Sequence, residues 1–385
     1  MRLVFWQNCI SPHQLPYIVE LVNDKRVDTV DIIVGESISG DRKLMGWELP
    51  PEMDEKKHIR GCNVYIHPDC SEMEMLLSKR INESVHLFSG IRAFEYVFNV
   101  FNASLKYNVK RGIITERPNT FAFGLTNGKP LWLHKIRFGL QDRKFIPYIH
   151  YIFAIGRECE NYYSSISKDW KVFPFAYCTA SPQINNSKLN VVADGNCRKE
   201  ERLDTINLLY VGSLSWRKNV RLLLVACREY CNFCIDLVGD GPQRRKLETI
   251  ASKCNLKNVR FWGYKKNSEI PAIMASHDVL VLPSIYDGWG AVINEALMNG
   301  LYVICSDKCG AKDILRNKRI GMVFRGGETE ELSNCLLYVE THIDEIRQDR
   351  PYRKKWSEEH ISGKAIAMYM VSCLYAEVIT PPWQK

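Results

Sequence analysis

The sequence lacks the features that mark several large classes of protein. It has no apolar run near the roughly 18 residues that a membrane-spanning helix needs. The apolar stretch at its start turns polar at Gln7 and Asn8, which is too early for a secretory signal. It has no low-complexity tract, and 46% of its residues are hydrophobic and 25% charged. We therefore expect a globular protein that folds throughout and is cytoplasmic.

Patterns of metal and cofactor binding are also missing. No Asp-x-Asp sequence occurs in the chain, and no Gly-x-Gly-x-x-Gly follows the first predicted strand. The 14 cysteines are scattered through predicted strands and helices, so buried thiols are expected instead of disulfides. Cys231-Asn-Phe-Cys234, with Cys227 upstream, resembles half of a zinc site, yet no second pair follows at the required spacing. We predict no metal ion and no cofactor.

The charge is mildly basic, with a net value of +8. This balance favours anionic ligands and surfaces without indicating nucleic acid as a partner. In residues 129–144, KPLWLHKIRFGLQDRK, basic and apolar residues are interleaved. We interpret this segment as an amphipathic helix on a sheet. Peripheral contact with an anionic membrane is the alternative, and it would depend on Lys135, Arg137, Arg143 and Lys144.

A chain of 385 residues is expected to form two domains. From residue 207 onward, short apolar runs alternate with helical patterns, which indicates a parallel sheet with helices on both faces. The first half repeats this pattern less regularly. Its strands are predicted near residues 3–8, 30–36, 63–68, 84–90, 111–117 and 149–156. A polar, turn-rich stretch places the hinge near 180–205. We predict an α/β protein with two Rossmann-like, doubly wound sheets facing a cleft.

The stretch YDGWGAVINEALMNG, residues 286–300, follows a predicted strand with a loop and a helix. Gly288 and Gly290 would let the backbone approach a ligand closely, and the first turn of the helix would offer amide donors to an anion. Asp287 either caps the helix or reaches a ligand hydroxyl. Glu295 is either a satisfied structural acid or a carboxylate that receives ligand hydroxyls. The residues alone leave the two readings of each acid open.

Three further motifs precede this stretch. YVGSLSWRKN, residues 210–219, ends a strand and places Lys218 at a helix start, where it can neutralise a diphosphate or simply be solvated. VGDGP, residues 238–242, is a common strand-to-helix turn. VRFWGY ends a strand at Gly263 and Tyr264, where backbone or ring can meet a flat base, although a structural turn is equally expected.

In this order, the four motifs resemble the donor domain of the GT-B glycosyltransferases, in particular glycosyltransferase family 4, over residues 208 to about 305. The resemblance implies that Glu295 holds the ribose of a nucleotide and that Asp287 contacts the transferred sugar. It also implies that Lys218 contacts the diphosphate. The backbone that meets sugar and phosphate is matched by Gly288, Trp289, Gly290 and Ala291.

The match departs from the family at two positions. Asp287 is one methylene shorter than the usual glutamate. Ser213 stands where the family often has an arginine, and Arg217 is the candidate to replace that arginine. These departures put the sugar contact and one phosphate contact in question.

The resemblance implies a metal-independent, retaining glycosyltransferase that moves a sugar from a nucleotide-diphosphate sugar to a glycan or lipid-linked acceptor. Residues 1–190 would bind the acceptor, residues 200–360 the nucleotide sugar, and residues 361–385 would form a helix that crosses back. Bacterial surface polysaccharide synthesis, of lipopolysaccharide O-antigen or capsule, is the expected context. A nucleotide-sugar epimerase of the same fold and a binding-only relative are the alternatives.

The N-terminal half offers weaker candidates for the acceptor side. His13 lies at a predicted helix start near the expected cleft, where it would orient an acceptor hydroxyl or the donor sugar, or belong to the surface structure. Ser89 to Arg92 and the pair Glu116 and Arg117 also follow predicted strands. We rank them below His13.

Overall fold

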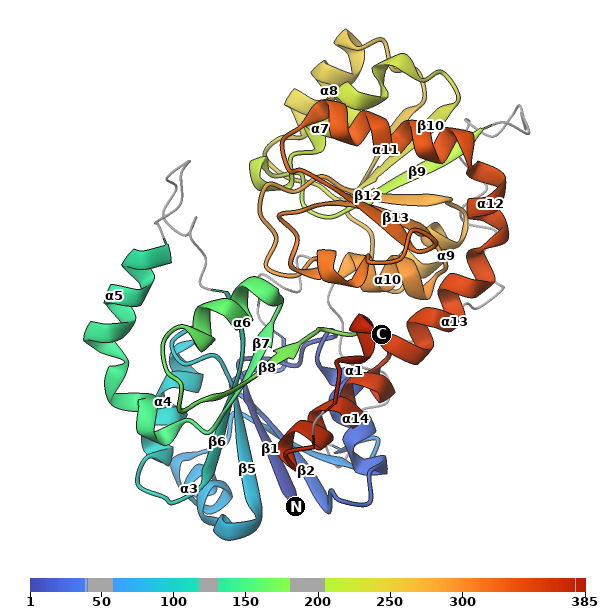
Figure 1. Ribbon diagram of the computed structural model, residues 1–385. Coiled ribbons are helices and arrows are strands. Elements are labelled where there is room, and N and C mark those ends of the chain that lie inside the picture. The colour runs from blue at the N-terminus through green and yellow to red at the C-terminus, as the bar shows by residue number, and fades with distance from the viewer. Residues whose placement is uncertain (39, 41–57, 118–130, 181–204, 378) are drawn as a thin grey trace.

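The computed structural model describes residues 1–385 except 39, 41–57, 118–130, 181–204 and 378. It contains two α/β domains, each built on its own mainly parallel sheet with helices on both faces (Figure 1). Residues 181–204 of the predicted hinge lie outside the described residues. In the described part, no helix combines the length and apolar character that a membrane span requires.

The N-terminal sheet has eight strands in the order β3-β4-β2-β1-β5-β6-β7-β8. Its strands are β1 (Arg2–Gln7), β2 (Thr29–Val34), β3 (His58–Ile59), β4 (Cys62–Ile66), β5 (Ser84–Ser89), β6 (Lys110–Glu116), β7 (Tyr151–Ile155) and β8 (Lys171–Phe175). Only the short hairpin strand β3 pairs antiparallel, among the described strands. The helices are α1 (Leu15–Glu20), α3 (Cys70–Ser78), α4 (Glu95–Ser104), α5 (Leu131–Gln141) and α6 (Arg157–Ser164).

Strand β8 was not predicted from the sequence. Its sequence KVFPF contains Pro174, which cannot donate a backbone hydrogen bond and so argues against a strand. The structure accommodates Pro174 because β8 lies at the edge of the sheet and pairs only with β7, in the described residues.

The C-terminal sheet has six parallel strands in the order β11-β10-β9-β12-β13-β14. They are β9 (Ile206–Val211), β10 (Phe233–Val238), β11 (Val259–Gly263), β12 (Val279–Leu282), β13 (Tyr302–Ser306) and β14 (Gly321–Phe324). The helices are α7 (Val220–Ala226), α8 (Arg244–Lys253), α9 (Ile270–Ala275), α10 (Val292–Met298), α11 (Thr329–Thr341), α12 (Ile343–Gln348) and α13 (Arg350–His360). The strand order reverses between β9 and β12. Ligands of such sheets bind at the carboxyl ends of the two strands that flank the reversal.

The last long helix, α14 (Gly363–Leu374), packs against α1 in the N-terminal domain, whereas α13 packs against α10 (Figure 1). Ser362 caps α14, because its side chain accepts a hydrogen bond from the amide of Ala365 at 3.2 Å. Gly363 allows a close approach, since a Cβ there would lie 2.2 Å from the carbonyl oxygen of Pro16. The C-terminal segment therefore ties the two domains together.

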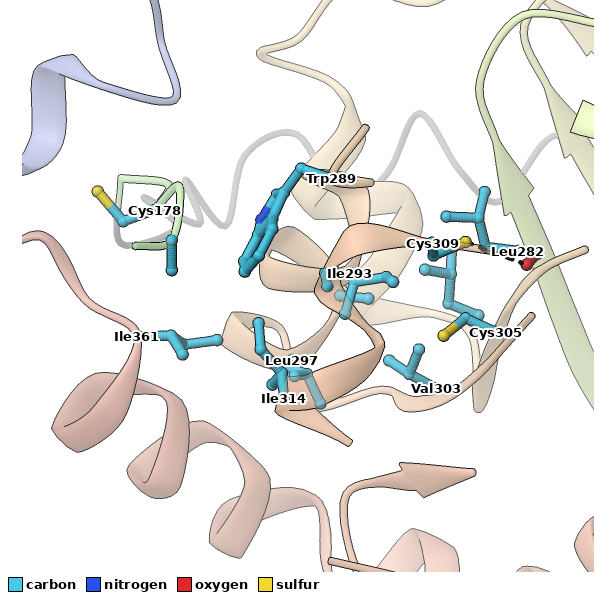
Figure 2. Packing of buried hydrophobic residues seen from close by; sticks show 14 of the residues in the cluster. Cys178, Leu282, Trp289, Ile293, Leu297, Val303, Cys305, Cys309, Ile314 and Ile361 are labelled. Carbon is cyan, nitrogen blue, oxygen red and sulfur yellow. Dashed lines mark hydrogen bonds between the residues drawn. The ribbon is translucent and has the colours of Figure 1, made fainter. Parts of the chain in front are cut away.

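One hydrophobic core runs through both domains. Figure 2 shows part of it, where Trp289 and Leu297 of the C-terminal domain lie near Cys178 and Ile361. The described cysteines are all free thiols, and most are buried, as expected. Apolar packing thus joins the two domains on this side.

Candidate active site

The site is built where the loops after β9 and β12 meet. The amide of Ile285 donates to the carbonyl oxygen of Arg217 at 2.8 Å, and the Arg217 guanidinium donates to the carbonyl oxygen of Tyr286 at 3.3 Å. These bonds place Lys218 of the first loop against Asp287 of the second, and the two side chains form an ion pair. Lys218 is buried, with 8% of its surface exposed. Residues that are 69 positions apart in the sequence thus form the centre of the site.

Glycines make this close loop packing possible. A Cβ at Gly239, in the VGDGP turn, would lie 2.0 Å from the carbonyl oxygen of Gly212. A Cβ at Gly241 would lie 2.7 Å from the carbonyl oxygen of Leu214. Both distances are far below a normal contact, so this common strand-to-helix turn sets the position of the loop that carries Lys218.

The loop that carries Asp287 is held by the segment after β13. The amide of Asp287 donates to the Lys308 carbonyl oxygen and the amide of Gly310 donates to the Asp287 carbonyl oxygen, both at 3.1 Å. A Cβ at Gly310 would lie 2.0 Å from the carbonyl oxygen of Gly288. Gly290 has φ +90°, a left-handed conformation that favours glycine. We call residues 287–291 the donor loop, and its backbone is held on both sides.

Trp289 of the donor loop faces the protein interior. Its indole is 3% exposed and donates to Oδ1 of Asn294 at 2.8 Å. The Asn294 amide in turn donates to the carbonyl oxygen of Tyr177 in the N-terminal domain at 3.0 Å. The edge of one of the Tyr177 and Trp289 rings meets the face of the other. The Trp289 side chain therefore joins the domains, which leaves only its backbone for a ligand.

Glu295 lies on α10 and is partly buried. Among the residues that the structure describes, none donates a hydrogen bond to its carboxylate. Burial raises the pKa of Glu295 to about 7. A carboxylate in this state gains most from hydroxyl donors supplied by a ligand.

The remaining predicted residues of the C-terminal domain lie at the same edge of the sheet. The backbone oxygen of Ser213 accepts a hydrogen bond from the Tyr210 hydroxyl at 2.9 Å, and its side chain lies 3.3 Å from the Ser215 hydroxyl. Gly263 ends β11 with φ +70°, and its carbonyl oxygen accepts from the amide of Gly239 at 2.8 Å. The Tyr264 ring is 59% exposed. Ser213 is thus engaged within its own loop, whereas Tyr264 is open to a ligand.

The N-terminal domain meets the donor loop through Glu116, at the end of β6. A Cβ on Gly288 would lie 1.8 Å from Oε2 of Glu116, so the absence of a side chain at position 288 admits this carboxylate. His13 lies beside Tyr177, with the ring centroids 6.2 Å apart. Glu116 ranked below His13 in the sequence analysis. Glu116 differs from His13 by its contact with Gly288, and a single sequence does not reveal that contact.

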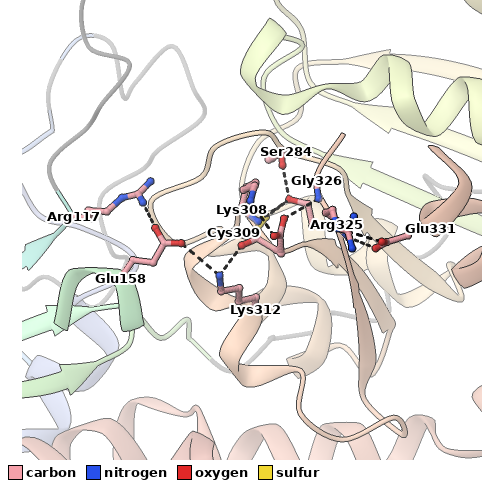
Figure 3. Close-up of polar contacts among 11 residues, drawn as sticks. Arg117, Glu158, Ser284, Lys308, Cys309, Lys312, Arg325, Gly326 and Glu331 are labelled. Carbon is pink, nitrogen blue, oxygen red and sulfur yellow. Dashed lines mark hydrogen bonds and ion pairs between the residues drawn. The ribbon is translucent and has the colours of Figure 1, made fainter. Parts of the chain in front are cut away.

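A pocket between the domains adjoins the donor loop. Its lining includes Arg117, Glu158, Asp287, Gly288 and Lys312. Glu158 pairs with Arg117 on one side and lies 3.5 Å from Lys312 on the other (Figure 3). In the part of the chain that the structure describes, no three histidine, cysteine, aspartate or glutamate side chains cluster as metal ligands do. The lining of the pocket holds more cationic than acidic residues, because Arg157 and Lys308 belong to it as well.

Residues 197–361 match the family described as Glycosyl transferases group 1. The match covers less than half of the chain and lies in its C-terminal half. All of the C-terminal residues described above, from Ser213 to Glu295, lie inside this matched region. Membership of family 4 remains a prediction.

Two relatives illustrate the similarity to known proteins. The "uncharacterized 41.2 kDa protein in cps region" of Klebsiella pneumoniae is 24% identical over 258 residues, which is 62% of this chain and 64% of that protein. The 2-deoxystreptamine glucosyltransferase of Streptomyces kanamyceticus is 28% identical over 170 residues, or 42% of this chain and 44% of that enzyme. The matched stretches thus span less than two thirds of either relative.

Solved structures share the whole fold. HepE of Anabaena in complex with UDP has a TM-score of 0.71 at 14% identity, over 98% of this chain and 100% of that one. Sucrose-phosphate synthase of Thermosynechococcus elongatus has a TM-score of 0.64 at 16% identity, over 98% and 99% of the two chains. The predicted GT-B architecture, with two parallel-sheet domains, is confirmed.

Proposed function

We propose that this protein transfers a sugar from a nucleotide-diphosphate sugar to a glycan or a lipid-linked acceptor. The observation that carries this proposal is the buried pair of Lys218 and Asp287 at the reversal of strand order, together with the Glu295 carboxylate, to which none of the described residues donates a hydrogen bond. Three groups at one sheet edge match the three parts of a sugar nucleotide. The Lys218 cation matches the diphosphate, and the carboxylates of Glu295 and Asp287 match the hydroxyls of the ribose and of the sugar. The match of residues 197–361 to the group 1 glycosyl transferases supports the same reading.

We assign one role to each of these side chains. Glu295 accepts hydrogen bonds from the ribose hydroxyls, and Asp287 contacts the transferred sugar. Lys218 stabilises the charge that develops on the diphosphate as the bond to the sugar breaks. Arg217 assists Lys218, because it lies in the same loop and its guanidinium reaches the donor loop. Asp287 also holds Lys218 in place before the donor arrives.

The finer properties of the reaction are part of the proposal. We infer a metal-independent reaction, since the sequence has no Asp-x-Asp motif to hold a divalent ion and protein cations lie at the site. Retention of the anomeric configuration rests on the resemblance to family 4. We propose UDP as the donor nucleotide, because HepE of Anabaena was solved with UDP and with UDP-glucose. Closure of the two domains would exclude water from the reaction.

We place the reaction in the synthesis of a bacterial surface polysaccharide. Similarity to a protein of the cps region in Klebsiella pneumoniae supports this context. WaaG, which has the same fold at a TM-score of 0.58, is described as involved in lipopolysaccharide biosynthesis. Both similarities concern other proteins. Measuring capsule and lipopolysaccharide in a strain that lacks this protein would test the context.

A donor screen tests the proposed reaction. The protein is incubated with a panel of nucleotide sugars and a mixture of cell-envelope acceptors, in the presence of EDTA, and the release of nucleotide diphosphate is measured. We expect that one UDP-sugar releases UDP and that this release continues in EDTA. The anomeric configuration of the product should be the same as that of the donor. A changed sugar still attached to its nucleotide would identify an epimerase instead.

We also propose a peripheral contact between α5 and an anionic membrane. Ile136 and Leu140 on this helix are 51% and 82% exposed, and Lys135 lies beside them. Phe138, on the same helix, packs on Trp170 and anchors the helix to the domain. Neutralising Lys135, Arg137, Arg143 and Lys144 together should abolish sedimentation with anionic vesicles. Unchanged sedimentation would contradict the contact.

A further inference from the structure

We infer that the pocket between the two domains binds a negatively charged group of the acceptor. This inference rests on the proposed function, because it assigns a chemical class to the acceptor at that same site. The pocket is lined by residues of both domains, which include Arg117, Arg157, Glu158, Lys308 and Lys312. Asp287 and Gly288 of the donor loop line it too, so a group bound there lies next to the proposed sugar position.

The charge of the pocket points to an anion. Four cationic residues, Arg117, Arg157, Lys308 and Lys312, line it, and Lys308 also pairs with Asp307 at 2.9 Å. Asp287 is already neutralised by Lys218. Of the described residues that line the pocket, this leaves Glu158 as the one other carboxylate. Apolar walls between the domains strengthen the field of these cations, because less water is present to screen it.

Glu158 shows how the pocket would hold an anion. Its carboxylate pairs with Arg117 through Oε2, and its Oε1 lies 3.5 Å from Nζ of Lys312 (Figure 3). Arg117 comes from the end of β6, whereas Lys312 comes from the short helix at Gly310–Ile314 in the C-terminal domain. One carboxylate therefore bridges two cations that belong to different domains. A carboxylate or phosphate on the acceptor has the same chemistry.

The two cations are fixed more firmly than the carboxylate that joins them. The Arg117 guanidinium lies 5.3 Å from the centre of the Tyr286 ring, and Nζ of Lys312 donates to the carbonyl oxygen of Asp307 at 2.7 Å. Their side chains are 24% and 25% exposed, against 47% for Glu158. Half-exposed ion pairs are weak, so Glu158 can give way to an incoming anion at little cost. Glu158 is thus a competitor of the acceptor's charged group.

This view makes an unusual expectation about Glu158. Removing its charge should strengthen the binding of an anion, because the competing carboxylate is lost while both cations remain. A purely structural bridge between the domains predicts no such gain. The variants Arg117→Gln and Lys312→Gln should weaken the same binding, because each removes one charged contact.

The test uses small probes with UDP present at saturation, which occupies the proposed diphosphate site. Methyl glucuronide supplies a carboxylate, glucose 6-phosphate supplies a phosphate, and methyl glucoside is the neutral match. Binding to the wild-type protein is measured by calorimetry or ligand-observed NMR at low salt. We expect a charged probe to bind and the neutral probe to fail. Glu158→Gln should raise the affinity roughly threefold to tenfold, and Arg117→Gln or Lys312→Gln should lower it by about tenfold.

Two controls make the result specific. Arg221→Gln and Glu330→Gln change exposed charges on α7 and α11, away from the pocket, and should leave the probe affinity unchanged. The affinity for UDP is measured in the same samples, so failure of UDP to bind reports on the proposed function separately. The inference is overturned if neither charged probe binds better than the neutral one. It is also overturned if the pocket variants behave like Arg221→Gln and Glu330→Gln.

Discussion

The two domains share a doubly wound plan, yet their facing edges are built differently. In the C-terminal domain, backbone packs on backbone, as at Gly239 and Gly310, where a Cβ would meet a carbonyl oxygen at 2.0 Å. In the N-terminal domain, long polar side chains such as Glu116, Arg117 and Glu158 reach across to the other edge. The first construction holds the loop backbone in place by direct contact. The second allows its contacts to change when a ligand arrives.

This difference explains which chemistry each edge suits. A nucleotide diphosphate presents the same phosphates and ribose in every sugar nucleotide, so a rigid backbone site serves it well. Acceptors vary in charge and shape, and side chains can be exchanged without disturbing the sheet. We call the edge of the C-terminal domain the rigid edge, and it carries the motifs that we assign to the donor. We call the edge of the N-terminal domain the adaptable edge, and it carries the residues that we connect with the acceptor.

The largest effect is expected from Gly310→Ala, which places a side chain inside the backbone packing of the rigid edge. The new Cβ would lie 2.0 Å from the Gly288 carbonyl oxygen and 3.0 Å from the Trp289 Cα, and neither backbone atom can move alone. We expect a loss of about 1–3 kcal/mol in the free energy of unfolding, measured by denaturant titration, and the loss of detectable sugar transfer. Gly139→Ala is the matched control, since nothing lies within 4 Å of its Cβ. Equal behaviour of the two variants would show that the donor loop is not held rigidly.

A second prediction separates the two acids of the donor site. Asp287→Ala should reduce sugar transfer about a hundredfold, because the sugar contact is lost. It should change the affinity for UDP by no more than about threefold, since the variant leaves Lys218 free to meet the diphosphate. Steady-state kinetics and calorimetry on the same preparation distinguish the two effects. A parallel fall of turnover and UDP affinity would contradict the separate roles.

A smaller effect concerns the pH dependence of stability without ligand. The pKa of Glu295 is raised by burial from 4.5 to about 7, so ionising it opposes folding. This penalty is absent below pH 4.5, grows as the pH rises from 4.5 to about 7, and is constant above. Glu295→Gln should therefore be more stable than the wild type at pH 8, by roughly 1–3 kcal/mol. The advantage should shrink toward pH 5 in thermal denaturation. An advantage independent of pH would show that burial of the charge is not the cause.

Much of the rigid edge could be predicted from the sequence. Motif order and the alternation of strands and helices placed Lys218 and Asp287 each in a loop after a strand, and the structure brings the two into contact. The contacts of the adaptable edge could not be predicted, because nothing in the sequence indicates that Glu116 faces Gly288 or that Glu158 bridges two domains. Because Pro174 argues against a strand, the edge strand β8 was not predicted. The inward direction of the Trp289 side chain depends on Asn294 and Tyr177, which lie in different domains.

The central claim is that the C-terminal domain binds a nucleotide diphosphate through Glu295 and the neighbouring loops. Calorimetric titration of UDP into the wild-type protein and into Glu295→Ala tests it most directly, with His13→Ala as the matched variant on the acceptor side. We predict that UDP binds the wild type, that Glu295→Ala loses roughly tenfold to a hundredfold in affinity, and that His13→Ala retains it. Equal affinity in the wild type and Glu295→Ala, or no binding of any nucleotide diphosphate, would contradict the account.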